Sequence, residues 1–278
     1  MKLVHITFLL FALAATGCLF VGPRASTELH GYVQAGDLPA VQVKLRSGHS
    51  VNSTDGNGRS LLYVAALGGK AEMAEFLLDA GANPNQTASW KGNDTPLHAA
   101  TLHGQWRVVE ILVARNAKVD ARNKMRETPL LYAARAGYLR TTQVLLAAGA
   151  NPRAADSDGQ SALHYQPEYA RIQARRDRWA AELPNYKPGP ERPDYKAVME
   201  ALIRAGAAVD ATKKRLPRGF TPLMAACADA PIELVELLLE NGADFRLETA
   251  NKLTAYQIAE QRGRTNVMEL LIRRGYRP

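Results

Sequence analysis

One short motif recurs along this chain at a nearly constant interval, and the recurrence limits what the chain can fold into. The motif reads Thr-Pro-Leu-His-Ala-Ala at residues 95–100, and close variants occupy residues 128–134 and 221–226. Including weaker copies, the anchor positions are Leu29, Leu62, Leu97, Leu130, Leu163, Leu223 and Tyr256. Successive anchors are 33, 35, 33, 33, 60 and 33 residues apart. A unit of that length cannot bury its own apolar face, so we expect the copies to stack into one array with a continuous core.

The recurring residues each have a mechanical role in a unit of two helices. Thr or Ser at the start of the motif caps a first helix. The following Pro has no N–H, which costs nothing because an amide in the first turn has no partner within the helix. The Ala-Ala pair lets neighbouring units approach closely. Nineteen residues after the anchor, a Gly such as Gly81 ends a second helix in the left-handed conformation, and Asn116 fills this position in the third copy. The pattern predicts a helix–turn–helix unit in every copy.

The motif and its spacing resemble the ankyrin repeat over residues 27–278. The resemblance implies an all-α solenoid of about seven helix-turn-helix repeats with β-turn fingers between them. It further implies that the protein binds other proteins, is not an enzyme and uses no cofactor. Three histidines, His30, His98 and His164, fall at the His position of the motif, where the side chain ties a turn together.

The resemblance to ankyrin repeats implies that a partner contacts the fingertips and the concave face of the first helices. The residues expected to contact a partner are Trp90, Leu102, His103, Met125, Arg126, Tyr132, Arg135 and Tyr165, and Val64, Leu67 and Phe220 belong to the same expected surface. Aromatic, Arg and Met side chains are enriched at interface cores. Trp90 is expected to be an anchor at a finger tip; the alternative is a ring folded back against the neighbouring finger.

Two further departures from the repeat stand out. The 43 residues between Leu163 and Gly206 replace the usual 19, which indicates an insertion at about residues 166–189. Its segment 169–183 has helical periodicity, with Arg171, Arg175 and Arg178 on one face. These arginines either contact a partner or border a face that packs back on the solenoid, and both can hold together. A smaller insertion creates a basic finger at residues 213–218.

The N-terminus has the pattern of an export signal. Lys2 precedes an apolar stretch from Ile6 to Gly22, and residues 15–18 resemble the end of a bacterial lipobox, although Ala15 replaces the preferred Leu. This predicts a signal peptide at 1–18, lipidation of Cys18 and a short tether at 19–26. The expected location is the bacterial cell envelope, facing the periplasm, in the form of an outer-membrane lipoprotein. The alternatives are a soluble periplasmic protein and an uncleaved N-terminal anchor.

Composition points to a partner with an acidic surface, because the formal net charge is +8. The predicted export argues against nucleic acid. We find no metal-ligand spacing, nucleophile motif or phosphate-binding loop, and Cys227 falls where a small core residue is expected. The most specific hypothesis is an immunity protein that sequesters a toxic effector in the periplasm. The alternatives are a general periplasmic scaffold or stress-protection protein and, least favoured, an enzyme that uses the insertion.

Overall fold

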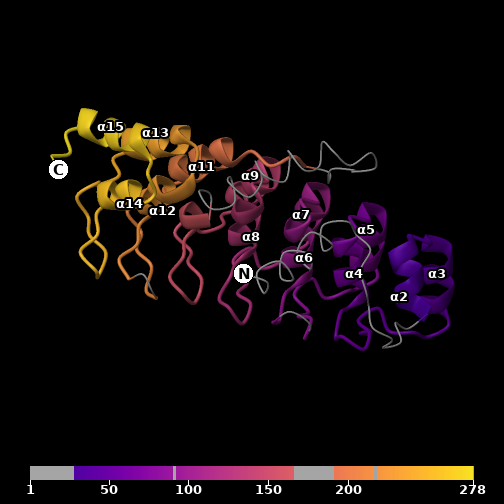
Figure 1. Ribbon diagram of the computed structural model, residues 1–278. Coiled ribbons are helices and arrows are strands. Elements are labelled where there is room, and N and C mark those ends of the chain that lie inside the picture. Colours follow the sequence, from indigo (N-terminus) through magenta and orange to yellow (C-terminus); the bar gives the residue numbers. More distant parts are fainter. Residues whose placement is uncertain (1–27, 90–91, 166–190, 216–217, 278) are drawn as a thin grey trace, which may run out of the picture.

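The computed structural model describes residues 28–89, 92–165, 191–215 and 218–277, and there the chain forms one row of helix pairs (Figure 1). The first helices of the pairs are α2 (Glu28–Ala35), α4 (Leu61–Leu67), α6 (Pro96–Leu102), α8 (Pro129–Ala136), α12 (Pro222–Asp229) and α14 (Ala255–Gln261). The second helices are α3 (Leu38–Arg46), α5 (Ala71–Asp79), α7 (Trp106–Ala114), α9 (Leu139–Ala147), α11 (Tyr195–Arg204), α13 (Ile232–Glu240) and α15 (Thr265–Arg273). Residues 162–165 begin the first helix of the fifth pair, whose second helix is α11.

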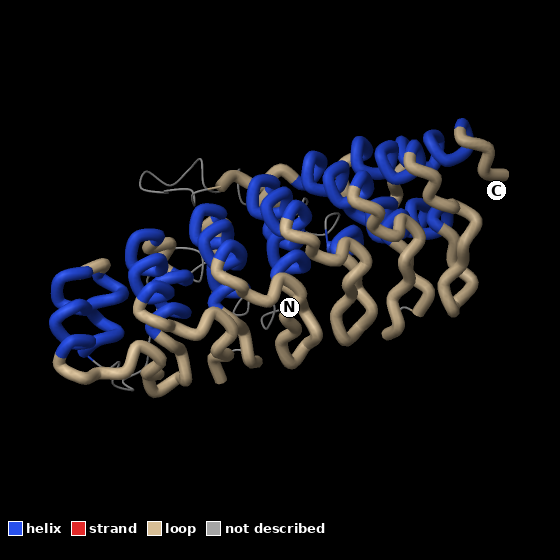
Figure 2. The backbone as a smooth tube through the Cα atoms, turned by 180° about the vertical axis from the view of Figure 1, so that it is seen from behind, coloured by secondary structure: helices blue, strands red, loops and turns tan. Residues whose placement is uncertain are grey.

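The pairs stack side by side, and the loops that join one pair to the next leave the array on the same side as long fingers (Figures 1 and 2). No strand occurs in the described ranges. Three of the fingers are closed by single antiparallel bridges, Thr54 with Ser60, Ala88 with Asp94, and Ala155 with Ser161. The predicted fold class, an all-α solenoid with β-turn fingers, is confirmed.

The first helices begin where the motif begins, because its first residue caps the helix. Ser60 Oγ accepts a hydrogen bond from the backbone N–H of Tyr63 at 3.1 Å. Thr95 and Thr221 accept in the same way, and a proline occupies the first turn of α6, α8 and α12. Such a cap contributes about 1 kcal/mol by satisfying an amide that has no partner within the helix.

The core runs along the array between the two layers of helices. The anchor leucines are completely or almost completely buried, and so are the Ala-Ala pairs that follow them, such as Ala99-Ala100 and Ala133-Ala134. Each buried leucine contributes roughly 1.5–3 kcal/mol relative to an exposed one. Because the alanine side chains between the helices are small, α6 packs closely against both α4 and α8.

The second helices end with a left-handed residue, as predicted. Gly81 has φ +89°, and the next amide, Ala82 N–H, closes the helix on Leu77 O at 2.9 Å. Asn116 adopts φ +62° at the equivalent position, where the third repeat has no glycine. Asparagine tolerates this conformation better than other side-chain-bearing residues.

Residues 191–194 lie at the junction of α8 and α9. Asp194 N–H donates to Gly137 O at 2.8 Å. The Glu191 carboxylate accepts from the amides of Arg140 and Thr141 and from the Thr141 hydroxyl, and so caps the start of α9. This segment places α11 beside α9 in the layer of second helices.

Several predictions fall on residues outside the described ranges. These are the signal peptide, the tether, Cys18, Trp90 and the insertion helix with Arg171, Arg175 and Arg178. Among the described helices, none combines the length and the apolar character needed to cross a membrane.

Candidate functional site

The fingers are organised by one acidic or amide side chain near the start of each. Asn123 Oδ1 accepts from the amides of Met125 and Glu127 at 2.9 and 3.0 Å. Asp55 and Asp156 accept from the second and fourth residues after them in the same way. A side chain that holds its own loop in this manner replaces backbone pairing and makes a tight turn stable without a strand.

Neighbouring fingers are hydrogen-bonded to one another near their tips. The links are Ser89 Oγ to Asn57 O (3.0 Å), Lys124 N to Gly92 O (2.7 Å), Ser157 N to Met125 O (2.8 Å), Lys214 N to Asp158 O (2.8 Å) and Ala250 N to Arg218 O (2.9 Å). Because each finger is fixed to the next, a surface that extends over several fingers is ordered before any partner binds. A preordered surface loses less conformational entropy on binding.

The three motif histidines connect each first helix to the finger that follows. Nε2 of His30, His98 and His164 lies 3.0, 3.1 and 3.0 Å from the carbonyl oxygens of Arg59, Glu127 and Phe220. A carbonyl can only accept, so each Nε2 carries the proton. Burial lowers the pKa of all three imidazoles, that of His164 to about 4. The predicted structural role of these histidines is confirmed.

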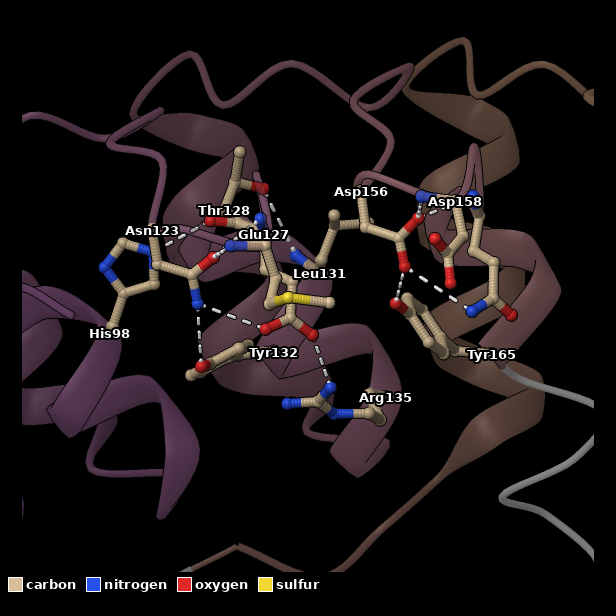
Figure 3. A network of polar contacts seen from close by, with 12 residues as sticks. His98, Asn123, Glu127, Thr128, Leu131, Tyr132, Arg135, Asp156, Asp158 and Tyr165 are labelled. Carbon is tan, nitrogen blue, oxygen red and sulfur yellow. Dashed lines mark hydrogen bonds and ion pairs between the residues drawn. The ribbon is translucent and has the colours of Figure 1, made fainter. Parts of the chain in front are cut away.

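A polar network lies at the middle of the array, on the finger side of α8 (Figure 3). The Tyr132 hydroxyl donates to the buried Asp94 carboxylate at 3.1 Å and accepts from Asn123 Nδ2 at 3.1 Å. The same Asn123 Nδ2 lies 3.1 Å from Glu127 Oε2, and Arg135 Nη1 pairs with Glu127 Oε1 at 2.5 Å. The network therefore runs from the base of one finger to the end of α8.

Two tyrosines that we expected on the exposed surface are buried instead. Tyr132 is 6% exposed and Tyr165 is 5% exposed. The physical reason is that each hydroxyl finds a carboxylate at the base of a finger, Asp94 for Tyr132 and Asp156, at 2.6 Å, for Tyr165. Val64, from the same expected surface, is also buried. Direct contact of these side chains with a partner stays an untested prediction.

Arg135 lies against both tyrosine rings. Its guanidinium carbon is 4.6 Å from the centroid of the Tyr132 ring and 5.7 Å from that of Tyr165. Together with the Glu127 pair, these contacts leave 24% of the Arg135 side chain exposed in a fixed orientation. The buried tyrosines thus position Arg135 at the surface.

The other expected contact residues are at or near the surface. Leu102 and His103 are half-buried at the end of α6, and Phe220 is half-buried in the sixth finger. Met125 is 53% exposed, and Arg126 beside it is exposed as well. The structure thus brings Met125, Arg126 and Arg135 to the same repeat, with Leu102 and His103 one repeat away.

Sequence reasoning missed two groups of residues. Trp106 lies between two arginines at the start of α7, with Arg140 4.0 Å and Arg107 5.1 Å from the ring centroid. Arg122, Arg153 and Lys214 line one concavity on three successive fingers, together with Arg126. In the second group, the sequence had singled out Arg126 and the basic finger that contains Lys214, whereas Arg122 and Arg153 carried no signal of their own.

The described residues offer little for chemistry. No group of three or more His, Cys, Asp and Glu side chains in the described part could hold a metal ion. Cys227 is fully buried, and burial raises the pKa of its thiol to about 12, so the reactive thiolate is not populated at neutral pH. The prediction of an inert core thiol is confirmed.

Stacked helix pairs with linked fingers define a repeat scaffold of the protein-interaction class. The chain belongs to the ankyrin-repeat family, since the family model for ankyrin repeats in three copies matches residues 29–123 and 192–278, and the single-repeat model matches residues 125–157. The ankyrin repeat domain of human ASB11 superposes with a TM-score of 0.71 at 25% identity, covering 91% of this chain and 100% of that chain.

The curated relatives are larger proteins. The inactive serine/threonine-protein kinase TEX14 of Mus musculus is 32% identical over 96 residues, which cover 34% of this chain and 6% of that protein. The transient receptor potential cation channel subfamily A member 1 of Homo sapiens is 25% identical over 236 residues, which cover 80% of this chain and 21% of that protein. The chain thus spans a small part of these relatives' length. Family membership makes it a protein-binding module.

Proposed function

We propose that this chain captures a folded partner protein with the finger side of its third to fifth repeats. The observation that carries the proposal is Met125, a large apolar side chain 53% exposed on a finger that is hydrogen-bonded to both of its neighbours. The other large apolar residues exposed in the described part, Val43 and Ile272, lie in the first and last helix pairs. An exposed apolar side chain on an ordered surface favours partner contact.

The centre of the proposed surface consists of Met125, Arg126 and Arg135, with Leu102 and His103 at its edge. Arg135 is suited to an interface because its orientation is already fixed by Glu127 and Tyr132. Little rotamer entropy is then lost when a partner covers it. Trp90 and the insertion arginines remain predicted contacts, with the arginines expected to affect the rate of association.

The proposed compartment is the bacterial cell envelope, with the chain attached to the outer membrane through lipid on Cys18. Support comes from Lys2, from the apolar stretch before Cys18, and from Leu19 after it, which favours the outer membrane in the bacterial sorting pattern. The eight residues 19–26 span at most about 30 Å, so the repeats would lie close to the bilayer. A soluble periplasmic form and an uncleaved anchor are the alternatives.

Cys18→Ser tests this attachment in cells. We expect the variant to lose membrane association or to keep an unprocessed signal, with metabolic labelling by a fatty acid abolished. Processing, labelling and membrane retention equal to those of the parent chain would contradict lipidation. The fractionation also separates the two alternatives, since only the soluble form appears in a periplasmic extract.

Within this compartment, the most specific version of the proposal is an immunity protein that blocks a toxic effector. An exported binding module would suit a dedicated inhibitor, and the residues that the structure describes hold no metal-binding cluster. The partner should be crosslinked to the full chain in cells and identified. A partner that is toxic in the periplasm when this chain is absent selects the immunity function. A deletion that causes only a stress phenotype selects the scaffold function.

The binding surface is tested with the partner so identified. We expect Met125→Ala and Arg135→Ala each to weaken binding by about 2 kcal/mol, roughly thirtyfold, if they lie at the interface centre. Val43→Ala and Ile272→Ala are matched controls, because they remove exposed apolar side chains at the ends of the array. If all four variants bind the partner with the affinity of the parent chain, the partner binds elsewhere.

A further inference from the structure

We infer that a basic concavity across three successive fingers binds an acidic, carboxylate-rich segment of a partner protein. This concavity, here called the basic groove, has a volume of about 450 Å³ and is lined by Arg122, Arg126, Arg153 and Lys214 with Ala155, Asp156 and Ser157. The inference rests on the proposed capture of a protein partner. It adds that this part of the finger side would bind the carboxylates of that partner.

The four cations come from three repeats and are held on one ordered platform. Arg122 and Arg126 belong to the fourth finger, Arg153 to the fifth and Lys214 to the sixth. Ser157 N–H bonds to Met125 O, and Lys214 N–H bonds to Asp158 O, both at 2.8 Å. The spacing of the charges is therefore set by backbone hydrogen bonds between fingers.

The positive charge of the basic groove is not balanced by its own lining. Asp156 is the single carboxylate there, and it accepts from Asp158 N, Gln160 N and the Tyr165 hydroxyl at 2.8, 2.9 and 2.6 Å. No ion pair within the described ranges involves any of the four cations. Arg153 makes a hydrogen bond to Gly206 O at 2.9 Å. Unneutralised like charges raise the local potential and attract an anionic partner.

Arg126 supplies an independent observation. It has φ +59° and follows the organising residue Asn123 by three positions, where the fingers of Asp55 and Asp156 have Gly58 and Gly159 with φ +72° and +80°. A side chain in this conformation is strained, and such strain is often found at functional positions. In the fourth finger the strained residue is thus Arg126, which lines the basic groove.

A polypeptide suits the basic groove better than a phosphate backbone. Met125 precedes Arg126 in the chain, its carbonyl accepts from the N–H of the groove residue Ser157, and its apolar side chain is 53% exposed. An acidic protein segment carries both carboxylates and apolar side chains, whereas a nucleic acid backbone or a lipid headgroup layer offers mainly phosphates. Single-stranded DNA and anionic vesicles are therefore the competing outcomes of the test.

The test uses the full chain and a fluorescent deca-glutamate peptide, with binding followed by anisotropy at low and at physiological salt. We expect binding that weakens as salt rises. The variant with Arg122, Arg126, Arg153 and Lys214 all changed to Gln should bind at least tenfold more weakly. The matched control changes Arg46, Lys196, Arg262 and Arg273, exposed residues outside the groove, to Gln, and we expect less than a twofold effect. Equal losses for the two variants would show that only net charge matters and would overturn the inference.

A second pair of variants separates the role of the side chain from that of the backbone. Arg126→Gly should weaken deca-glutamate binding at least threefold while the melting temperature does not fall. Lys252→Gly relieves the same strain, since Lys252 has φ +61°, and should leave binding unchanged.

Three further outcomes contradict the inference. Deca-glutamate affinity unaffected by the groove variants would overturn it. Tighter groove-dependent binding of a ten-residue oligothymidylate, or of phosphatidylglycerol vesicles, would assign the groove to a phosphate-bearing surface instead. If the groove variants still capture the partner protein with full affinity, the acidic-segment inference fails while the proposed function stands.

Discussion

Arg126 and Gly159 occupy the same position in neighbouring fingers, and both have a left-handed backbone, with φ of +59° and +80°. Each follows by three residues the side chain that organises its finger, Asn123 in one and Asp156 in the other. Glycine adopts this conformation freely, whereas a residue with a Cβ atom is strained by roughly 1–2 kcal/mol. The fourth finger thus has the backbone of a glycine turn and carries an arginine.

Arg126→Gly should stabilise the protein by about 0.5–1 kcal/mol. The relief of strain is partly offset by the larger chain entropy that glycine has in the unfolded state. Urea unfolding followed by circular dichroism measures the change. Arg126→Ala keeps the Cβ atom and should give no such gain; a gain of equal size for the alanine variant would mean that charge repulsion, not backbone strain, is relieved.

Tyr132→Phe should destabilise the protein by about 1–3 kcal/mol. The change removes the hydroxyl that donates to Asp94 at 3.1 Å, and Asp94 is 1% exposed, so water cannot replace the lost donor. The variant should also loosen Arg135, whose guanidinium lies over the same ring. The free energy of unfolding, measured in urea, gives the size of the effect.

Tyr63→Phe is the matched control for that change. Tyr63 is also buried, at 2% exposure against 6% for Tyr132, but its hydroxyl has no hydrogen-bond partner within the described residues. We expect its unfolding free energy to change by less than about 0.5 kcal/mol. Similar losses in the two variants would indicate that removing either tyrosine hydroxyl has this cost, and that the bond to Asp94 contributes nothing specific.

The helices and their ends were predictable because the signals that set them are local. Thr95 caps the helix that begins at the next residue by accepting from an amide three residues away, and Asn116 ends another helix at a fixed distance from its anchor. The burial of Tyr132 was not predictable in this way. Its hydroxyl bonds to Asp94, 38 residues earlier, and the repeat position alone does not show which finger residue will reach the ring.

The basic groove was also invisible in the linear sequence. Arg122 and Arg153 each look like an ordinary solvated charge, and the insertion separates Lys214, in the predicted basic finger, from the regular repeat spacing. Only the stacking register of the fingers brings them to one concavity. A comparison of equivalent finger positions does not pair Arg122 with Arg153 either, because they are 31 residues apart whereas the repeat there is 33 residues long.

Stability should fall as the pH drops below about 6.5, because the buried motif histidines remain neutral in the folded protein. Burial lowers the pKa of His164 to about 4 from an ordinary value near 6.5. Between these two values the unfolded chain binds a proton that the folded chain does not, so stability is complete above the unfolded pKa and declines toward pH 4. The slope for one such histidine is at most about 1.4 kcal/mol per pH unit. Urea unfolding at pH 7, 6 and 5 measures it.

His164→Gln should reduce that pH dependence. Glutamine occurs at the equivalent position of the last repeat, where Gln257 Oε1 accepts from Thr254 N–H at 2.9 Å, so the fold tolerates it. His49→Gln removes an exposed imidazole at the end of α3 and serves as the control. A slope that is unchanged in the His164 variant would assign the acid sensitivity to other groups.

Glu191→Ala should weaken the attachment of residues 191–194 to α9 by about 1 kcal/mol. The carboxylate accepts from the amides of Arg140 and Thr141 and from the Thr141 hydroxyl at 2.8 Å, so its loss leaves the first turn of α9 without a cap. Burial raises the pKa of Glu191 in spite of these bonds, which shows that the buried charge is partly unfavourable. Glu191→Gln, which keeps one acceptor oxygen and loses the charge, should therefore be milder than Glu191→Ala.

Amide hydrogen exchange should accelerate at residues 140 and 141 in the alanine variant and much less in the glutamine variant. Equal exchange in both variants and the parent chain would show that Glu191 does not hold this end of α9.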